Sequence, residues 1–243
     1  MAEVIAVWGT PASGKTTVAV KLARTLYQTR RKSVILLLTD WHTPGIPVVL
    51  PARREEHFSV GEVLSRVVLS EEDLLSGMNV YQKQENLALL GYTFGENRNT
   101  YPPLNHEKVS RFYELLGGMT DYLVVDCESD LSGNLLADMA VRNAGTVFGL
   151  LSPDLSSVGY RFSQLPLYPD ELFRTNRHIA VLNHPRRDIL WAEKEVRTLC
   201  HEVGLTLPYS GRLAAQSAEG TLLKETLDPR FEKAIRALAA KVP

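Results

Sequence analysis

The feature that most constrains this chain is a glycine-rich turn at residues 9–17, which lies between an apolar run and a helical stretch. The turn matches the pattern Gly-x-x-x-x-Gly-Lys-Ser/Thr without deviation. The apolar run 4–8 before it predicts a strand, and Val18, Leu22 and Leu26 after it share one face of a helix. A strand, a turn and a helix in this order favour an α/β fold. The turn consists of Gly9, Thr10, Pro11, Ala12, Ser13, Gly14, Lys15, Thr16 and Thr17.

A phosphate ligand explains the spacing within this turn. The loop must curve so that successive backbone N–H groups point inward, and Gly14 tolerates the backbone angles and the close approach that this needs. Lys15 then reaches the β- and γ-phosphates, Thr16 offers a hydroxyl to Mg²⁺, and the following helix directs its positive end at the anion. We therefore expect residues 9–17 to bind ATP with Mg²⁺. The alternative is a strand-to-helix turn without a ligand.

Further apolar runs predict the remaining strands. They are continuously apolar, which is typical of parallel strands covered on both faces, and helical stretches lie between them. One such stretch carries Val63, Leu64, Val67 and Val68 on an apolar stripe. The pattern predicts a doubly wound, mostly parallel sheet with helices on both faces, the Rossmann-like architecture of P-loop NTPases. The expected strands are residues 4–8, 33–38, 87–90, 122–125, 146–151, 179–182 and 205–207.

The size of the chain favours one domain over residues 1–243. No linker divides it, and 44% of its residues are hydrophobic, enough for one sizeable core. The net charge of −1 argues against a chain built mainly to coat nucleic acid. The sequence shows no basic leader and no apolar run of about 18 residues, which favours a cytoplasmic protein. Its two cysteines are then expected to be reduced thiols. Loops 41–54 and 91–105 follow strands, so we expect both at the sheet edge where ligands bind.

Two acidic residues complete the expected site. Asp126 ends the strand run 122–125, where a carboxylate holds Mg²⁺ through water. Asp40 ends the second strand and is placed to orient an attacking water or the metal. The alternatives are a cap or turn aspartate at 126 and a loop-capping aspartate at 40. Beside them, His42 is expected to be a solvated loop residue and Trp41 a packing aromatic, with a γ-phosphate contact and a partner contact as their alternatives.

A resemblance to a known family joins these segments. Taken in order they resemble the MinD/ParA-type P-loop ATPases, nearest to the CpaE/TadZ branch, over nearly the whole chain. The resemblance implies that Asn183 hydrogen-bonds adenine, since an amide offers both a donor and an acceptor, and that Pro208 lines the base pocket. Turn residues remain the alternative for both. The matching segments are 9–17 with the helix 18–26, 34–40, 120–126, 179–183, 207–209 with 214–220, and the closing helix 229–241.

Two positions depart from the family pattern, and the first of them concerns the dimer. The family carries a signature lysine after the first glycine of the loop, which crosses to the partner's nucleotide, and Thr10 stands there without a charge. Leu38 replaces the first aspartate of the family's Asp-x-Asp. The resemblance implies an ATP-dependent homodimer with a protein partner from an assembly or secretion machine, and a DNA or membrane surface stays an alternative partner.

Three functions remain open at this point. The first is a slowly hydrolysing ATPase that acts as a positioning or assembly switch, in which Lys15 and Asp40 are catalytic. The second is a small-molecule phosphotransferase, although no compact arginine-rich lid segment is visible. The third is a nucleotide-binding partner module that does not hydrolyse ATP, which the missing lysine favours.

Overall fold

A computed structural model describes residues 1–50, 59–80, 86–168, 177–184, 193–200 and 202–243. Its centre is an eight-stranded sheet with the order β3-β4-β2-β5-β1-β6-β7-β8. Every pairing is parallel except the antiparallel pair of β3 and β4. The strands are β1 Glu3–Gly9, β2 Val34–Leu38, β3 Asn79–Val80, β4 Leu87–Gly91, β5 Tyr122–Asp126, β6 Thr146–Leu151, β7 His178–Asn183 and β8 Val203–Leu207.

The central strand shows why the strand runs are continuously apolar. Successive side chains of a strand point to opposite faces, and both faces of this sheet are covered. Ile5 and Val7 belong to the core on one face of β1, while Ala6 and Trp8 belong to the core on the other. The predicted α/β fold, with its mostly parallel sheet and helices on both faces, is confirmed.

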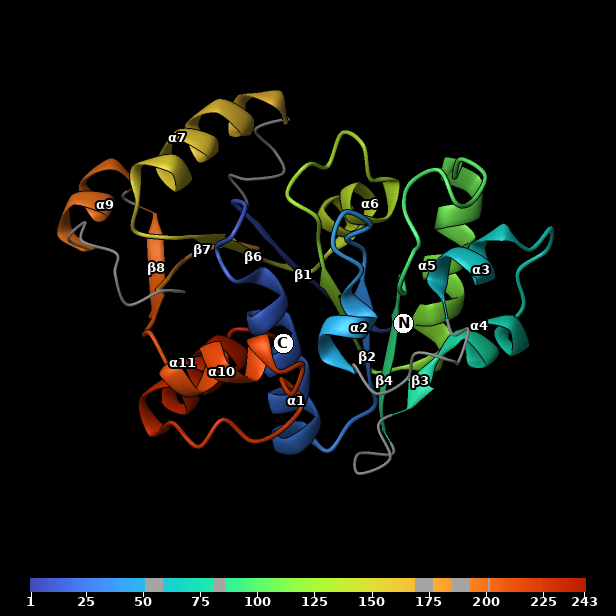
Figure 1. Ribbon diagram of the computed structural model, residues 1–243, viewed down its shortest axis with the longest axis horizontal. Helices are drawn as coiled ribbons and strands as arrows, with labels where there is room; N and C mark the ends of the chain where they lie inside the picture. Colours follow the sequence, from blue (N-terminus) through green and yellow to red (C-terminus); the bar gives the residue numbers. More distant parts are fainter. Residues whose placement is uncertain (51–58, 81–85, 169–176, 185–192, 201) are drawn as a thin grey trace.

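The helices form a layer on each face of the sheet (Figure 1). Buried residues of α1 Lys15–Arg30, α2 Gly45–Val49, α10 Gly211–Ala218 and α11 Pro229–Ala239 share one core. Those of α3 Val60–Ser65, α4 Glu71–Gly77, α5 His106–Met119 and α6 Leu135–Asn143 share the opposite core. A third, smaller core includes residues of α7 Leu155–Gln164 and α9 Glu193–Leu199. A short 3₁₀ helix, Leu165–Leu167, follows α7.

One expected helical stripe is wrong. Helix α3 ends at Ser65, and Val67 and Val68 are 94% and 77% exposed. The reason is local, because Ser70 and Asp73 form a capping box that starts α4, so residues 66–69 become a connection. The predicted loop 41–54 contains the short helix α2, and residues 51–54 lie outside the described ranges.

The C-terminal helix α11 packs against the rest of the protein through its apolar face. Phe231, Ile235 and Leu238 of α11 are buried against α1 and the sheet, which satisfies its apolar face. Among the described residues, no helix has both the length and the apolar character that a membrane crossing requires.

Candidate nucleotide-binding site

The glycine-rich turn leaves β1 at the carboxyl edge of the sheet and adopts a curled backbone. Ala12 and Gly14 have positive φ angles of 57° and 84°. The amide of Thr10 donates to the carbonyl of Leu150 at 3.0 Å. The hydroxyl of Ser13 donates to the carbonyl of Thr10 at 2.7 Å, which closes the curve from inside. This conformation concentrates backbone N–H groups on the concave side of the loop.

The start of α1 supplies unpaired donors to the same concave side. Gly14 caps the helix without a side-chain hydrogen bond, and the first intrahelical bond runs from the amide of Val18 to the carbonyl of Gly14. Within the described part of the chain, no group accepts a hydrogen bond from the amides of Lys15, Thr16 or Thr17. A helix that begins in this way binds an anion through these groups and through its positive end.

Gly9 allows the loop to pass against the neighbouring strand. Its φ is 150°, and a Cβ added at this position would lie 2.0 Å from the carbonyl oxygen of Leu150 on β6. Only glycine fits this contact, so the first glycine of the motif is required by the packing of β1 on β6.

The ammonium group of Lys15 lies folded over the loop. Its Nζ donates to Oγ of Ser129 at 2.6 Å and to the carbonyl of Thr10 at 3.2 Å. Burial lowers the pKa of Lys15, while the negative charges of Asp126 and Asp40 act in the opposite direction. The cation is therefore held at the loop by polar contacts that a phosphate group can replace.

Asp126 ends β5 beside the start of α1 and is only 3% exposed. Burial raises its pKa to about 7, which a hydrogen bond with Thr16 and the charge of Lys15 only partly offset. Its Oδ1 is buried and has no hydrogen-bond partner in the described part of the chain. An orphaned carboxylate oxygen beside a threonine hydroxyl fits a hard cation such as Mg²⁺, which prefers oxygen ligands.

Asp40 follows β2 and caps the turn after it. Its Oδ1 accepts from the amides of His42 at 2.8 Å and Thr43 at 3.0 Å, as the loop-capping alternative predicts. The charge of Asp40 also acts on the pKa values of Lys15 and Asp126, so the carboxylate belongs to the same site. Its capping bonds do not exclude a contact with water through the other oxygen.

The sequence reasoning missed a polar network that joins the loops after β2 and β5. Glu128, 6% exposed, pairs through Oε1 with Nδ1 of His42 and accepts at Oε2 from Nδ2 of Asn134 at 2.8 Å. The same amide of Asn134 donates to the carbonyl of Thr39 at 2.7 Å. Burial raises the pKa of Glu128, and its bond to Asn134 and its contact with His42 oppose this rise. The loop that carries Asp40 is thus joined to the loop that follows Asp126.

Among the described residues, Asp40, His42 and Glu128 also form a group with cation-ligand chemistry. One ligand atom of each lies within 4.8 Å of the others. This group adjoins Asp126, so it belongs to the same charged edge of the sheet.

The ends of β7 and β8 form a cavity of about 350 Å³ next to the phosphate loop. Asn183 and Pro208 both line it, together with Gly14, Thr17 and residues of α10. Nδ2 of Asn183 donates to the carbonyl of Ser13 at 2.7 Å, so this amide connects the cavity to the loop. The structure therefore gathers all of the predicted cofactor-binding residues at one edge, while their roles remain predictions.

Three neighbours of the site pack into the protein. Thr10 is 3% exposed, and its Oγ1 lies 2.6 Å from Oγ of Ser157 on α7, so the side chain points into the protein. Cys127 is buried, as expected for a small packing residue. Trp41 packs against Tyr92 with ring centroids 6.2 Å apart, which agrees with its expected packing role.

Solved structures show what this fold resembles. No protein-family model matches the sequence, and no curated protein matches it. MinD of Aquifex aeolicus superimposes with a TM-score of 0.73 at 20% identity, over 99% of this chain and 96% of that one. MinD of Pyrococcus horikoshii with Mg-ADP gives 0.69 at 16%, over 98% and 96%. A plasmid partition protein of Borrelia burgdorferi bound to AMPPNP gives 0.74 at 14%, over 99% of both. The chain thus has the fold of MinD/ParA-type P-loop ATPases.

Proposed function

We propose that this chain binds ATP with Mg²⁺, hydrolyses it slowly and acts as a nucleotide-dependent positioning or assembly switch. The observation that carries the proposal is the buried Oδ1 of Asp126, which lies beside Thr16 next to the curled loop and has no hydrogen-bond partner among the described residues. A buried carboxylate oxygen without a hydrogen-bond partner is costly in a folded protein, and a cation held there would remove that cost.

Residues 15–17 of the loop and the residues beside it have separate roles in this proposal. The free amides of residues 15–17 bind phosphate oxygens, and Lys15 turns from Ser129 to the β- and γ-phosphates. Thr16, through its hydroxyl, and Asp126, through its carboxylate, would hold Mg²⁺. The metal, when bound, neutralises charge on the phosphates. Asn183 and Pro208 receive the base in the adjoining cavity.

Hydrolysis is assigned to Asp40. Its Oδ1 caps the turn at His42 and Thr43, which fixes the carboxylate at the edge of the phosphate site. From there it orients the attacking water, while Lys15 stabilises charge that develops on the phosphates.

The proposed switch rests on the hydrogen-bonded contacts between the loop after β2 and the loop after β5. Glu128 contacts His42 on the loop after β2 and Asn134 at the start of α6. A γ-phosphate that draws Asp40 toward water shifts this network, and hydrolysis reverses the shift. We propose that the ATP form is a homodimer of a cytoplasmic, single-domain protein of the CpaE/TadZ branch, whose partner is an assembly or secretion component. A membrane or nucleoid surface is the alternative partner.

The test is sedimentation of the purified protein without nucleotide, with ADP, and with ATP plus Mg²⁺, with phosphate release recorded in parallel. We expect an ATP-dependent shift from monomer to dimer. Lys15→Ala should abolish this shift, and Asp40→Ala should prolong the lifetime of the dimer. Lys233→Ala removes an exposed lysine of α11 and is the charge-matched control, which should behave as wild type. Binding of ATP at constant mass without phosphate release would refute the switch.

A nucleotide-binding module without turnover is the second candidate. It is favoured by Thr10, whose hydroxyl is turned toward Ser157 and supplies no charge for a partner's nucleotide. The same experiment separates the two candidates, since the module predicts ATP binding that Lys15→Ala removes while phosphate release stays at background. A small-molecule phosphotransferase would instead form ADP only when an acceptor is added, with the phosphoryl group on the acceptor and no free phosphate released.

A further inference from the structure

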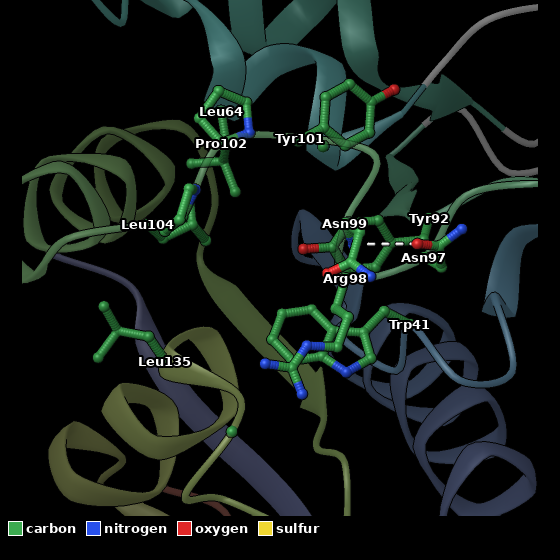
Figure 2. A pocket seen from close by; sticks show the side chains of 13 residues that line it. Trp41, Leu64, Tyr92, Asn97, Arg98, Asn99, Tyr101, Pro102, Leu104 and Leu135 are labelled. Atoms are coloured by element: carbon green, nitrogen blue, oxygen red, sulfur yellow. Dashed lines mark hydrogen bonds between the residues drawn. The ribbon is translucent and has the colours of Figure 1, made fainter.

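A second cavity opens on the other side of the loop that carries Asp40. Its volume is about 230 Å³, and none of its lining residues also lines the cavity at Asn183. The loop after β2, the loop between β4 and α5, and the loop before α6 form it together with residues of α3 and the first residue of α6. Figure 2 shows Leu104 and Leu135 on one side of the opening and Trp41, Tyr92 and Arg98 on the other.

The aromatic wall of this cavity is firmly held. Trp41 packs on Tyr92, whose side chain is buried. The hydroxyl of Tyr101 donates to Oε1 of Glu96, and its ring lies over Gly61, where an added Cβ would be 2.2 Å from a ring carbon. A wall that is fixed before binding loses little conformational freedom when a ligand arrives.

The mouth of the cavity is rich in hydrogen-bond donors. Oδ1 of Asn97 accepts from the amide of Asn99 at 3.0 Å, so the NH₂ group of Asn97 remains available (Figure 2). Arg98 between them is exposed, and its guanidinium has no ion pair within the described part of the chain. Glu96, two residues before Arg98, makes no ion pair with it in this described segment, since its oxygens accept from the amide of Thr93 at 2.7 Å and from the hydroxyls of Ser59 and Tyr101.

The size of the cavity decides between classes of ligand. Pockets for small molecules and cofactors enclose about 300–1,000 Å³, and this one is smaller. It has room for a single apolar or aromatic side chain, and planar guanidinium and amide donors at the mouth suit a carboxylate. We propose that this cavity binds a partner protein through an acidic segment, in which one aromatic or aliphatic side chain fills the cavity and a neighbouring carboxylate contacts Arg98.

The position of the cavity links it to the candidate nucleotide site. Trp41 directly follows Asp40, and Leu135 directly follows Asn134, which bonds Glu128. The loops that would move with the γ-phosphate therefore also form the walls of the cavity. A nucleotide that changes these walls must therefore change the affinity of the cavity for the partner segment. By thermodynamic linkage, the partner segment must change the affinity for the nucleotide by the same factor.

The test is selection of a random dodecapeptide phage library on the full-length protein, with Gly133→Trp as the counter-selection. Gly133 lines the cavity, and the nearest atom to a Cβ added there is a side-chain oxygen 3.7 Å away, so a side chain can begin at this position without a backbone clash at its Cβ. We expect enriched peptides with an aromatic or aliphatic residue flanked by aspartate or glutamate. Arg98→Ala should weaken their binding about tenfold, or about 1.4 kcal/mol, while Arg230→Ala on α11 should not.

Two results would overturn the proposal. One concerns the enriched peptides themselves, which must be neither neutral nor basic if the proposal holds. They must also bind Gly133→Trp more weakly than wild type, with circular dichroism showing that both proteins are folded. The other is that Arg98→Ala and Arg230→Ala weaken binding equally. A separate arm compares peptide affinity with and without ATP and Mg²⁺. Only that arm rests on the proposed function, so its failure alone counts against the switch and leaves the peptide site standing.

Discussion

The replacement Lys21→Met is expected to remove a pH dependence from the stability of this protein. Lys21 lies on α1, is 2% exposed, and donates from Nζ to Oε1 of Gln216 and the carbonyl of Lys224, both at 2.7 Å. Burial lowers its pKa from 10.5 to about 7, the positive charge of Arg24 adds to this effect, and Glu232 opposes it. The protonated side chain is therefore disfavoured in the folded state relative to the unfolded chain.

The sign follows from proton binding in the two states. Between pH 7 and pH 10.5 the unfolded chain holds a proton on Lys21 that the folded protein has lost, so the free energy of unfolding rises with pH. The slope approaches about 1.4 kcal/mol per pH unit. Because half of the folded molecules remain protonated at pH 7, the rise between pH 7 and pH 9 amounts to about 2 kcal/mol. Well below pH 7 both states carry the proton, and the contribution is flat.

The assay is urea unfolding followed by circular dichroism at pH 7, 8 and 9. Other titrating groups are the same in wild type and Lys21→Met, so the difference between their unfolding free energies isolates this side chain. We expect the difference to grow by about 2 kcal/mol in favour of wild type from pH 7 to pH 9. Lys233→Met, at an exposed position of α11, should give a constant difference. A constant difference for Lys21→Met as well would refute the reasoning.

Three further substitutions test other parts of the structure. Gly9→Ala places a Cβ 2.0 Å from the carbonyl oxygen of Leu150, so we expect loss of folded protein by circular dichroism, and a soluble variant with native stability would contradict the packing argument. Leu238→Ala, at a fully buried position, should lower the free energy of unfolding by about 2–5 kcal/mol in urea. Ser129→Ala removes an acceptor from Lys15 and should tighten ATP binding by up to about tenfold in calorimetry. Weaker binding would mean that Ser129 positions the lysine for phosphate.

The sheet was largely predictable from local pattern. The expected strand at residues 4–8 is β1 Glu3–Gly9, and the runs at 122–125 and 146–151 are the strands beside it. Burial on both faces produces such runs, so one sequence carries the signal. The strand β3 was missed because it has only two residues, Asn79 and Val80, and no alternation can be recognised in so short a segment.

The candidate site was predictable only in part. The loop and Asp126 follow from residue spacing and from the end of an apolar run. The contacts of Ser129 with Lys15 and of Glu128 with His42 join loops that are far apart in sequence, and no local pattern records which loops meet at a sheet edge. The turn-capping bonds of Asp40 were stated only as an alternative, since an aspartate after a strand fits both a cap and a site residue.

The placement of β1 at the middle of the sheet has a consequence for biosynthesis. Strand β1 is made before its partners β5 and β6, so Ile5 meets Val124 and Thr146 only after more than a hundred further residues have been made. At about 5–20 residues per second, the nascent strand waits on the order of ten seconds without its neighbours. During that interval its apolar side chains are exposed, which makes this segment a target for chaperones that bind emerging chains.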